Sequence, residues 1–175
     1  MKKTLYRWQS AGFIFVGIMG VLLHFLFDIT GQSVIVAPFA AVNESVWEHI
    51  KILFFPMLVF AFIQGRFIGK EYGNFWCVKL AGTVLGVLLI PVLYYTIIGI
   101  FGAVPDWINI LMFYVTAAIV YITETKLLRH NRLNCKSPKT AVTVLLLVAL
   151  TLSALTFFPP HIPLFEDPIT KTYGI

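Results

Sequence analysis

The chain has 175 residues, of which 59% are hydrophobic and only 12% are charged. Soluble domains carry about 25% charged residues to cover their surface, so this composition excludes an ordinary soluble protein. It predicts an all-α bundle of membrane-spanning helices in a single domain, residues 1–175. The net charge of +5 comes mainly from connections between apolar runs, which is typical of membrane orientation and predicts no nucleic-acid partner.

Five apolar stretches are long enough to cross a bilayer, which takes about 20 helical residues. The predicted spans are residues 8–27, 46–64, 75–101, 107–125 and 141–158. The first stretch is too long for the apolar region of a cleaved signal peptide, so we expect it to remain as a span. The proline-rich residues 159–175 are predicted to form a cap on the outer face.

Residues 32–42 form a further apolar stretch that contains Pro38. This stretch is shorter than a spanning helix needs to be. We expect it to lie in the membrane interface or to dip into the bundle as a re-entrant segment. If it crossed instead, the chain would have six spans, and every later connection would change sides.

The basic residues predict the orientation of the chain. All Lys and Arg residues except Lys51 and Lys171 lie on one side of the five-span arrangement. Because short cytoplasmic loops are enriched in Lys and Arg, the N-terminus is predicted inside and the C-terminus outside the cell membrane, with membrane lipid as the implied partner. Cys77 and Cys135 fall far apart in sequence on the inner side, so we expect no disulfide between them.

The outer side gathers most of the acids and histidines. In the first span, Gly17, Gly20, His24 and Asp28 recur at three- and four-residue spacing and share one helical face. The two glycines predict close contact with a neighbouring helix. His24 is expected near the outer membrane surface, where Asp28 orients its imidazole or shares a ligand with it. A simple interhelical hydrogen bond is the alternative for this pair.

The second predicted span begins with a strongly polar turn. Ser45 and Glu48 have the spacing of a capping box, so Ser45 is predicted as the N-cap. Glu44, Glu48 and Lys51 fall on one stripe of the helix, beside Ser45 and His49. Ionisable groups at this depth are costly and are candidates for function, although a self-neutralising Glu48–Lys51 pair is the simpler alternative. The opposite arc is predicted to face lipid and comprises Ile50, Leu53, Phe54 and Met57.

Together these residues predict one outward-facing site. Neutral imidazoles and a carboxylate hold zinc in catalytic sites and leave one position open for water. The predicted metal ligands are His24, Asp28, His49 and His161, the last of which is a surface residue of the tail in the alternative reading. The predicted catalytic residues are Glu48 or Glu44 as general base, Lys51 as a stabiliser of developing negative charge, and Ser45.

Residues 43–49 read Asn-Glu-Ser-Val-Trp-Glu-His and are followed by Lys51 and Pro56. This segment resembles the signature of a family of small multi-pass bacterial membrane proteins of unknown function. The His24-x3-Asp28 pair and the proline-rich ending are similar too, so the resemblance covers nearly the whole chain. It implies a bacterial origin and a membrane location, and it implies no activity.

A fainter resemblance is to membrane hydrolases that cleave lipid amides with zinc. Those enzymes use three His, an Asp and a Ser, and the candidates of each type in this chain are His24, His49, His161, Asp28 and Ser45. The chain differs from them in having fewer spans and in lacking an HxxxH pair.

Three functions remain open from the residues alone. The first is an outward-facing, metal-dependent hydrolase or transferase that acts on a lipid or lipid-linked substrate. The second is a subunit that binds or transports a small solute or ion, although transport sites commonly lie near the midplane between repeats, and neither feature is evident here. The third is a structural or accessory membrane protein whose polar residues hold an outer cap.

Overall fold

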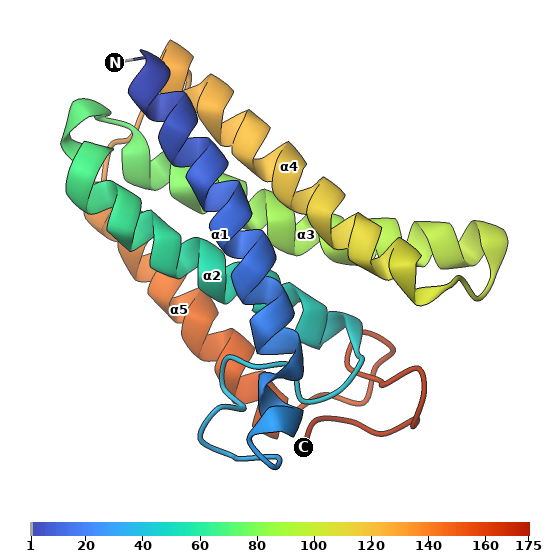
Figure 1. Cartoon of the computed structure of the whole chain (residues 1–175). Helices are drawn as coiled ribbons and strands as arrows, with labels where there is room; N and C mark the ends of the chain where they lie inside the picture. The colour runs from blue at the N-terminus through green and yellow to red at the C-terminus, as the bar shows by residue number, and fades with distance from the viewer. Residues whose placement is uncertain (1) are drawn as a thin grey trace.

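Five helices, each long and apolar enough to cross a membrane, make up most of the chain. They are seen in a computed structural model that describes residues 2–175 (Figure 1). Their bounds are α1 Lys2–Ile29, α2 Val46–Ile68, α3 Phe75–Phe101, α4 Asp106–His130 and α5 Pro138–Phe157, with a short 3-10 helix η1, Gly69–Glu71, after α2. The predicted all-helical, five-span architecture is confirmed.

The helices extend beyond the predicted spans mainly at the end that carries the N-terminus. Here α1 begins at Lys2, α2 continues to Ile68, and α4 continues to His130. The predicted spans counted apolar residues only, whereas a helix continues past the hydrocarbon core for as long as its backbone hydrogen bonds close. Asn131 then ends α4 in the left-handed conformation, with φ of 48°, and Ser137 caps α5.

The segment of residues 32–42 is a series of turns rather than a helix. Ala37 is fully buried in a cluster with Phe27, and the Ala41 amide donates to the Leu23 carbonyl at 3.1 Å. The segment therefore folds back against the end of α1. The six-span alternative is wrong, because residues 2–175 contain five helices of spanning length and no sixth.

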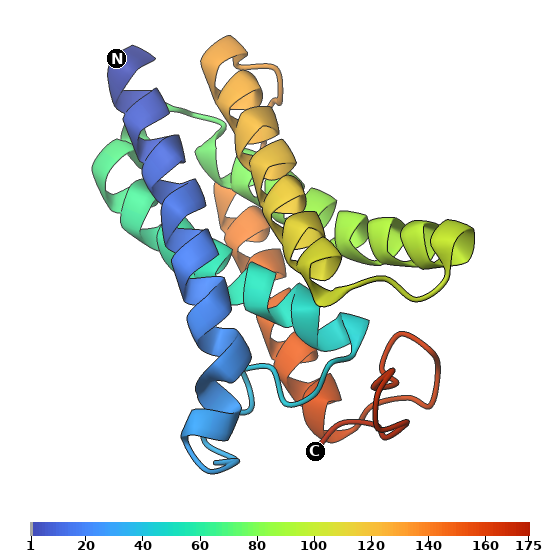
Figure 2. The same ribbon diagram turned by 45° about the vertical axis from the view of Figure 1, so that its right-hand side comes forward.

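Helix α2 lies at the centre of the bundle and contacts each of the other four helices. In Figure 1, α1 and α5 flank α2, and α4 lies against α1 and α3. The second half of α3 and its turn into α4 project away from the bundle (Figures 1 and 2), and Val92, Ile100 and Phe101 are accordingly exposed. The two ends of the chain lie at opposite ends of the bundle, as an odd number of spans requires.

The central position of α2 corrects one prediction. Ile50, Leu53, Phe54 and Met57 were predicted to face lipid, but each is at most 4% exposed. Lipid tails and a protein core are equally apolar, so composition does not distinguish the two sides of this helix. Both the polar stripe and the apolar arc of α2 therefore pack against protein.

The close contact predicted for Gly17 and Gly20 is confirmed. Tyr114 of α4 lies against Gly17 and Phe113 lies against Gly20, so near that a β-carbon on either glycine would collide with the ring. The Tyr114 hydroxyl also donates to the Gly17 carbonyl at 3.4 Å. These contacts hold the second half of α1 against the start of α4, and His24 lies one turn further along α1.

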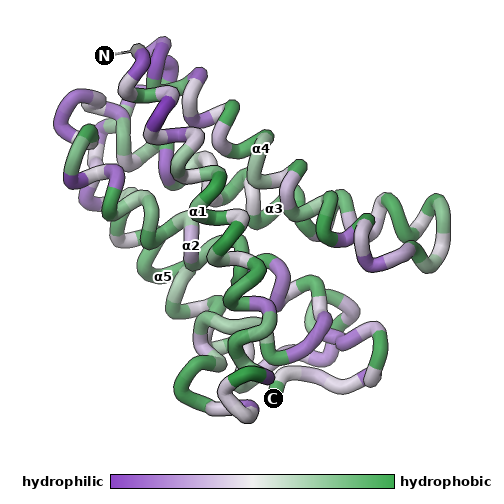
Figure 3. The backbone as a smooth tube through the Cα atoms, in the orientation of Figure 1, coloured by the Kyte–Doolittle hydropathy of each residue, from purple (hydrophilic) through white to green (hydrophobic). Residues whose placement is uncertain are grey.

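Polar residues gather at the two ends of the bundle, and apolar residues lie between them (Figure 3). We call the end with the N-terminus the basic end. There, Lys79 of α3 and Glu124 of α4 form a buried ion pair, and the buried amides of Gln9 and Gln64 lie beside it on α1 and α2. A charge inside an apolar bundle needs a partner, so this pair fixes how four helices meet at the basic end.

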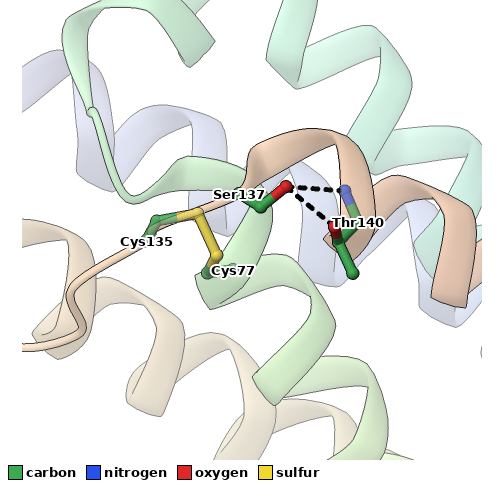
Figure 4. Close-up of a disulfide and its surroundings, with 4 residues drawn as sticks. All are labelled: Cys77, Cys135, Ser137 and Thr140. Atoms are coloured by element: carbon green, nitrogen blue, oxygen red, sulfur yellow. Dashed lines mark hydrogen bonds between the residues drawn. A yellow bond between two sulfur atoms is a disulfide. The ribbon is translucent and has the colours of Figure 1, made fainter.

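A disulfide joins Cys77, near the start of α3, to Cys135 in the connection between α4 and α5 (Figure 4). The prediction that these cysteines stay unpaired was wrong. A separation of 58 residues says little about distance once the helices return repeatedly to the same two ends of a bundle. A disulfide at the basic end also disagrees with the placement of that end in the reducing cytoplasm, so the predicted orientation needs a test of its own. The bridge anchors this connection close to Ser137, which caps α5 and hydrogen-bonds Thr140.

The orientation predicted from the basic residues places the basic end in the cytoplasm and the C-terminal tail outside. The exposed Asn134 and Thr170 lie at these two ends, and the native cysteines are bonded to each other. A maleimide that cannot cross membranes should therefore label Thr170→Cys in intact cells and Asn134→Cys only after the membrane is opened. The unsubstituted chain controls for native thiols, and the reverse labelling pattern would contradict the orientation.

Candidate functional site

Three side chains that can bind a metal converge at the end opposite the basic end, which we call the histidine end. His24 comes from α1, Glu44 from the loop before α2, and His49 from the first turn of α2. Nε2 of His24 lies 3.5 Å from Oε2 of Glu44, and Nε2 of His49 lies 3.7 Å from the same oxygen. Tetrahedral zinc, with bonds of about 2.1 Å, holds its ligand atoms about 3.4 Å apart. The group is therefore close to metal-binding geometry.

The loop that carries Glu44 is tied to the C-terminal tail. The Asn43 side chain accepts a hydrogen bond from the Ser45 amide at 2.9 Å and donates one to the Gly174 carbonyl at 3.0 Å. The Glu44 amide donates to the Asp167 carboxylate at 3.5 Å. Contacts from the far end of the chain thus place Glu44 beside the two histidines.

The hydrogen bond at the back of the His49 ring fixes its tautomer. Nδ1 lies 2.9 Å from the Ser45 carbonyl oxygen, which can only accept. Nδ1 therefore carries the proton in the neutral ring, and Nε2 carries a lone pair. That lone pair lies on the side of Glu44, the arrangement that a metal-binding histidine needs.

Glu44 keeps its negative charge at neutral pH. The hydrogen bond with His24 holds the pKa of the Glu44 carboxyl below its usual value, and partial burial opposes this effect without reversing it. The carboxylate thus faces a ring nitrogen lone pair on His49. Two acceptors at this distance repel unless a proton or a cation lies between them, so the group is suited to hold either one.

Two cavities meet at these side chains. One, of about 290 Å³, reaches toward α3 and is lined by Tyr94 and Ile98. The other, of about 440 Å³, lies between α1 and α4 and is lined by Val21 and Ile110. The residues that line both cavities are Glu44, His49, Asp106, Asn109, Phe113 and Ile169. The candidate metal group is therefore accessible from two directions.

Asp106 and Asn109 are members of this site that the sequence did not identify. They lie three residues apart in the first turn of α4 and face the shared part of both cavities. Oδ1 of Asn109 is buried and has no hydrogen-bond partner within residues 2–175. The sequence does show this polar pair at the outer start of a predicted span, but nothing in the sequence places that start beside His24 and His49.

Two of the four predicted metal ligands lie outside the group. Asp28 is exposed in the last turn of α1, and the group of three ligands does not include it. His161 is exposed in the tail, and its ring stacks on Tyr173 with the ring centres 4.6 Å apart. The site thus joins His24 and His49 to Glu44, which was predicted as a base rather than as a ligand.

Glu48 and Lys51 form a fully buried ion pair instead of facing a cavity. The Lys51 ammonium also donates to the Ala37 carbonyl at 2.8 Å and to the Thr156 hydroxyl at 2.7 Å. The Glu48 carboxylate accepts from the Val42 amide at 3.2 Å and from the Thr156 hydroxyl at 3.1 Å. This network connects the loop, α2 and α5, and the structure therefore gives the pair a positioning role.

Ser45 is the N-cap of α2, as predicted. Its hydroxyl accepts from the Glu48 amide at 3.4 Å, and the residue is only 1% exposed. The return bond of a capping box does not form, because the Glu48 carboxylate turns to Lys51 and the Ser45 amide donates to Asn43. Ser45 thus holds the helix start, and its carbonyl orients His49.

Thr156→Val tests the network that holds the histidine end. The change keeps the side-chain shape but removes a hydroxyl shared by Lys51 and Glu48, so we expect a loss of about 1–3 kcal/mol in stability. Thermal unfolding in detergent measures it. The matched control is Thr151→Val on the same helix, whose exposed hydroxyl bonds only the Leu147 carbonyl. Equal unfolding temperatures for the two variants would show that this network is not needed.

Comparison with known proteins adds a family but no activity. No curated protein and no solved structure matches the chain. The sequence profile of a family of unknown function matches residues 1–175, which agrees with the resemblance drawn from the sequence. The chain is thus a multi-pass membrane protein that belongs to the family of unknown function DUF6512.

Proposed function

We propose that this protein is a metal-dependent hydrolase or transferase that acts on a lipid or lipid-linked substrate at the histidine end. The observation that carries the proposal is the convergence of His24, Glu44 and His49 where two cavities meet. Two imidazoles and one carboxylate, with a fourth position open, form a ligand set found in catalytic zinc sites. Zinc is the metal that this set favours.

The chain around the three ligands supports this proposal. The Ser45 carbonyl holds Nδ1 of His49, and such second contacts orient metal ligands and raise their basicity. Glu44 is ionised at neutral pH, as a carboxylate ligand must be. A zinc ion supplies a Lewis acid that activates water and polarises a carbonyl or phosphoryl oxygen.

Asp106 is the residue that we assign as general base. It lines both cavities beside Glu44 and His49, and its exposed carboxylate is free to exchange protons with the substrate or with water. Glu48 loses this role because its carboxylate is committed to Lys51 and Thr156. Asn109 contributes a buried carbonyl oxygen that has no partner among residues 2–175 and can accept a hydrogen bond from a bound substrate.

The route by which a substrate can reach the site is suited to a membrane lipid. The cavity between α1 and α4 is bordered by Val21, Phe25 and Ile110, which are exposed apolar residues of membrane-spanning helices. A substrate with an acyl chain can leave the bilayer along such a rim and present its polar group to the metal. A polar solute would gain nothing from these side chains.

Metal analysis of the purified protein tests the ligand set. The wild type should hold about one zinc ion per chain, as a site with three protein ligands does. His24→Ala, His49→Ala and Glu44→Gln should lose it. His161→Ala is the matched control, because its ring stacks on Tyr173 outside the group, and it should keep the metal. Negligible metal in the wild type, or equal metal in all samples, would refute the site.

The same proteins separate metal binding from catalysis. Asp106→Asn should keep the zinc and lower the metal-dependent hydrolysis of lipid esters or amides in micelles by about 10²–10⁴-fold, the usual contribution of a general base. Removal of the metal with a chelator should abolish turnover, and added zinc should restore it. Stoichiometric zinc with no turnover of lipid substrates would instead favour a binding subunit.

A further inference from the structure

A groove of about 620 Å³ runs between α1 and α4 at the basic end, far from the histidine site along both helices. On α4 it is lined by Ala118, Ile122, Lys126 and Arg129. These residues recur every three or four positions and therefore form one face of the helix. This face is apolar toward the middle of the membrane and basic at the end of the helix.

The polar end of the groove is positively charged. Lys126, Arg129 and His130 line it, and no carboxylate is found among its described lining residues. Glu124 lies close by in sequence, but its carboxylate is buried and paired with Lys79. Arg129 donates to the Tyr6 hydroxyl at 3.0 Å, which holds the guanidinium at the groove between the two helices. An anion would meet uncompensated positive charge here.

Gln9 marks the polar level of the groove. This residue lines the groove and is only 4% exposed. Its Oε1 accepts weak hydrogen bonds from Gln64 and Lys79, each at 3.5 Å, and its amide helps to stabilise the buried Glu124 carboxylate. The Gln9 side chain is thus tied to the buried Lys79–Glu124 pair, and Ser10 and Thr125 are the other polar lining residues at this level.

The apolar part of the groove lies on the side of the membrane interior, where an acyl chain would enter it. Phe13 and Ile14 of α1 face Ala118 and Ile122 of α4 across it. From Ala118 to Arg129 the helix rises about 16 Å, so the whole groove, with its headgroup end, spans about half the thickness of the 30 Å hydrocarbon core of a bilayer. The order of basic, polar and apolar lining thus matches the order of phosphate, ester and acyl groups in a phospholipid.

We propose that this α1–α4 groove binds one anionic phospholipid from the leaflet at the basic end. The phosphate lies among Lys126, Arg129 and His130, and one acyl chain follows Ala118 and Ile122. This site is independent of the proposed metal centre. It stabilises the contact of α1 with α4 and makes the folded protein dependent on the lipid composition of its membrane.

Native mass spectrometry of the detergent-solubilised full chain tests the site, with phosphatidylglycerol and phosphatidylcholine of equal chain length as probes. The wild type should retain one phosphatidylglycerol in preference to phosphatidylcholine. Arg129→Gln or Lys126→Gln should each weaken this binding by about five-fold, the usual effect of one basic contact at a membrane surface. Ala118→Phe should weaken it without any change of charge, because the added ring fills the path of the acyl chain.

Arg132→Gln is the matched control, because it removes the same charge from the same end but lies outside the groove lining. Its binding should equal that of the wild type. Glycerol phosphate, the headgroup chemistry without chains, should not compete. Equal retention of the two lipids, an equal loss in Arg132→Gln, unchanged binding in Ala118→Phe, or full competition by glycerol phosphate would each overturn the proposal.

Discussion

The buried ammonium of Lys51 is the constraint on which the histidine end depends. A charge in an apolar bundle is tolerated only when it is neutralised and hydrogen-bonded. Here the partners are the Glu48 carboxylate, the Ala37 carbonyl and the Thr156 hydroxyl, which come from α2, the preceding loop and α5. Satisfying one ammonium therefore brings three segments together. Such buried pairs add little net stability compared with apolar packing, so we infer that this one specifies position.

The site geometry follows from this network. Glu48 also accepts from the Val42 amide, and Glu44 is two residues further along the same loop. The loop cannot move away from α2 without breaking bonds to a buried charge. His49 is on the first turn of α2, and its tautomer is set by the carbonyl of the residue that caps the helix. The three candidate ligands are thus held in place by buried side chains that line neither cavity at the site.

A second buried Lys–Glu pair constrains the helices at the basic end. Lys79 and Glu124 join α3 to α4, while Gln9 and Gln64 bring α1 and α2 to the same point. Between the two pairs, the helices meet through apolar side chains and small residues. Membrane helices associate through close packing at small residues and through interhelical hydrogen bonds. The polar cluster at each end thus acts together with contacts such as those at Gly17 and Gly20 to place the helices.

The sequence was sufficient for the parts of this structure that depend on local pattern. Five apolar runs gave the five spans, Ser45 was identified as an N-cap, and the glycine spacing in the first span indicated close packing. The parts that depend on distances between segments could not be predicted. The buried arc of α2 is as apolar as a lipid-facing one, and the Cys77–Cys135 bridge joins the start of α3 to the connection between α4 and α5, 58 residues further along the chain.

The candidate site also combines features that local pattern predicts with features that depend on how distant segments meet. Periodicity placed His24 and Asp28 on one face of a helix, and the structure brings only His24 to the group, because the side chain one turn later already lies at the surface. Glu44 became a candidate ligand through bonds from its loop to Asp167 and Gly174. Asp106 belongs to the site because α4 begins beside α1. None of these relations has a signature in a single sequence.

X-ray absorption at the zinc edge of the zinc-loaded protein tests the central claim most directly, because it reports the ligands themselves. The account predicts a first shell of nitrogen and oxygen atoms at about 2.0–2.1 Å, with the outer-shell scattering of two imidazole rings and no sulfur. The scattering of one ring should disappear in His49→Ala. A shell that contains sulfur, or one of oxygen atoms without imidazole scattering, would contradict a metal centre built from His24, Glu44 and His49.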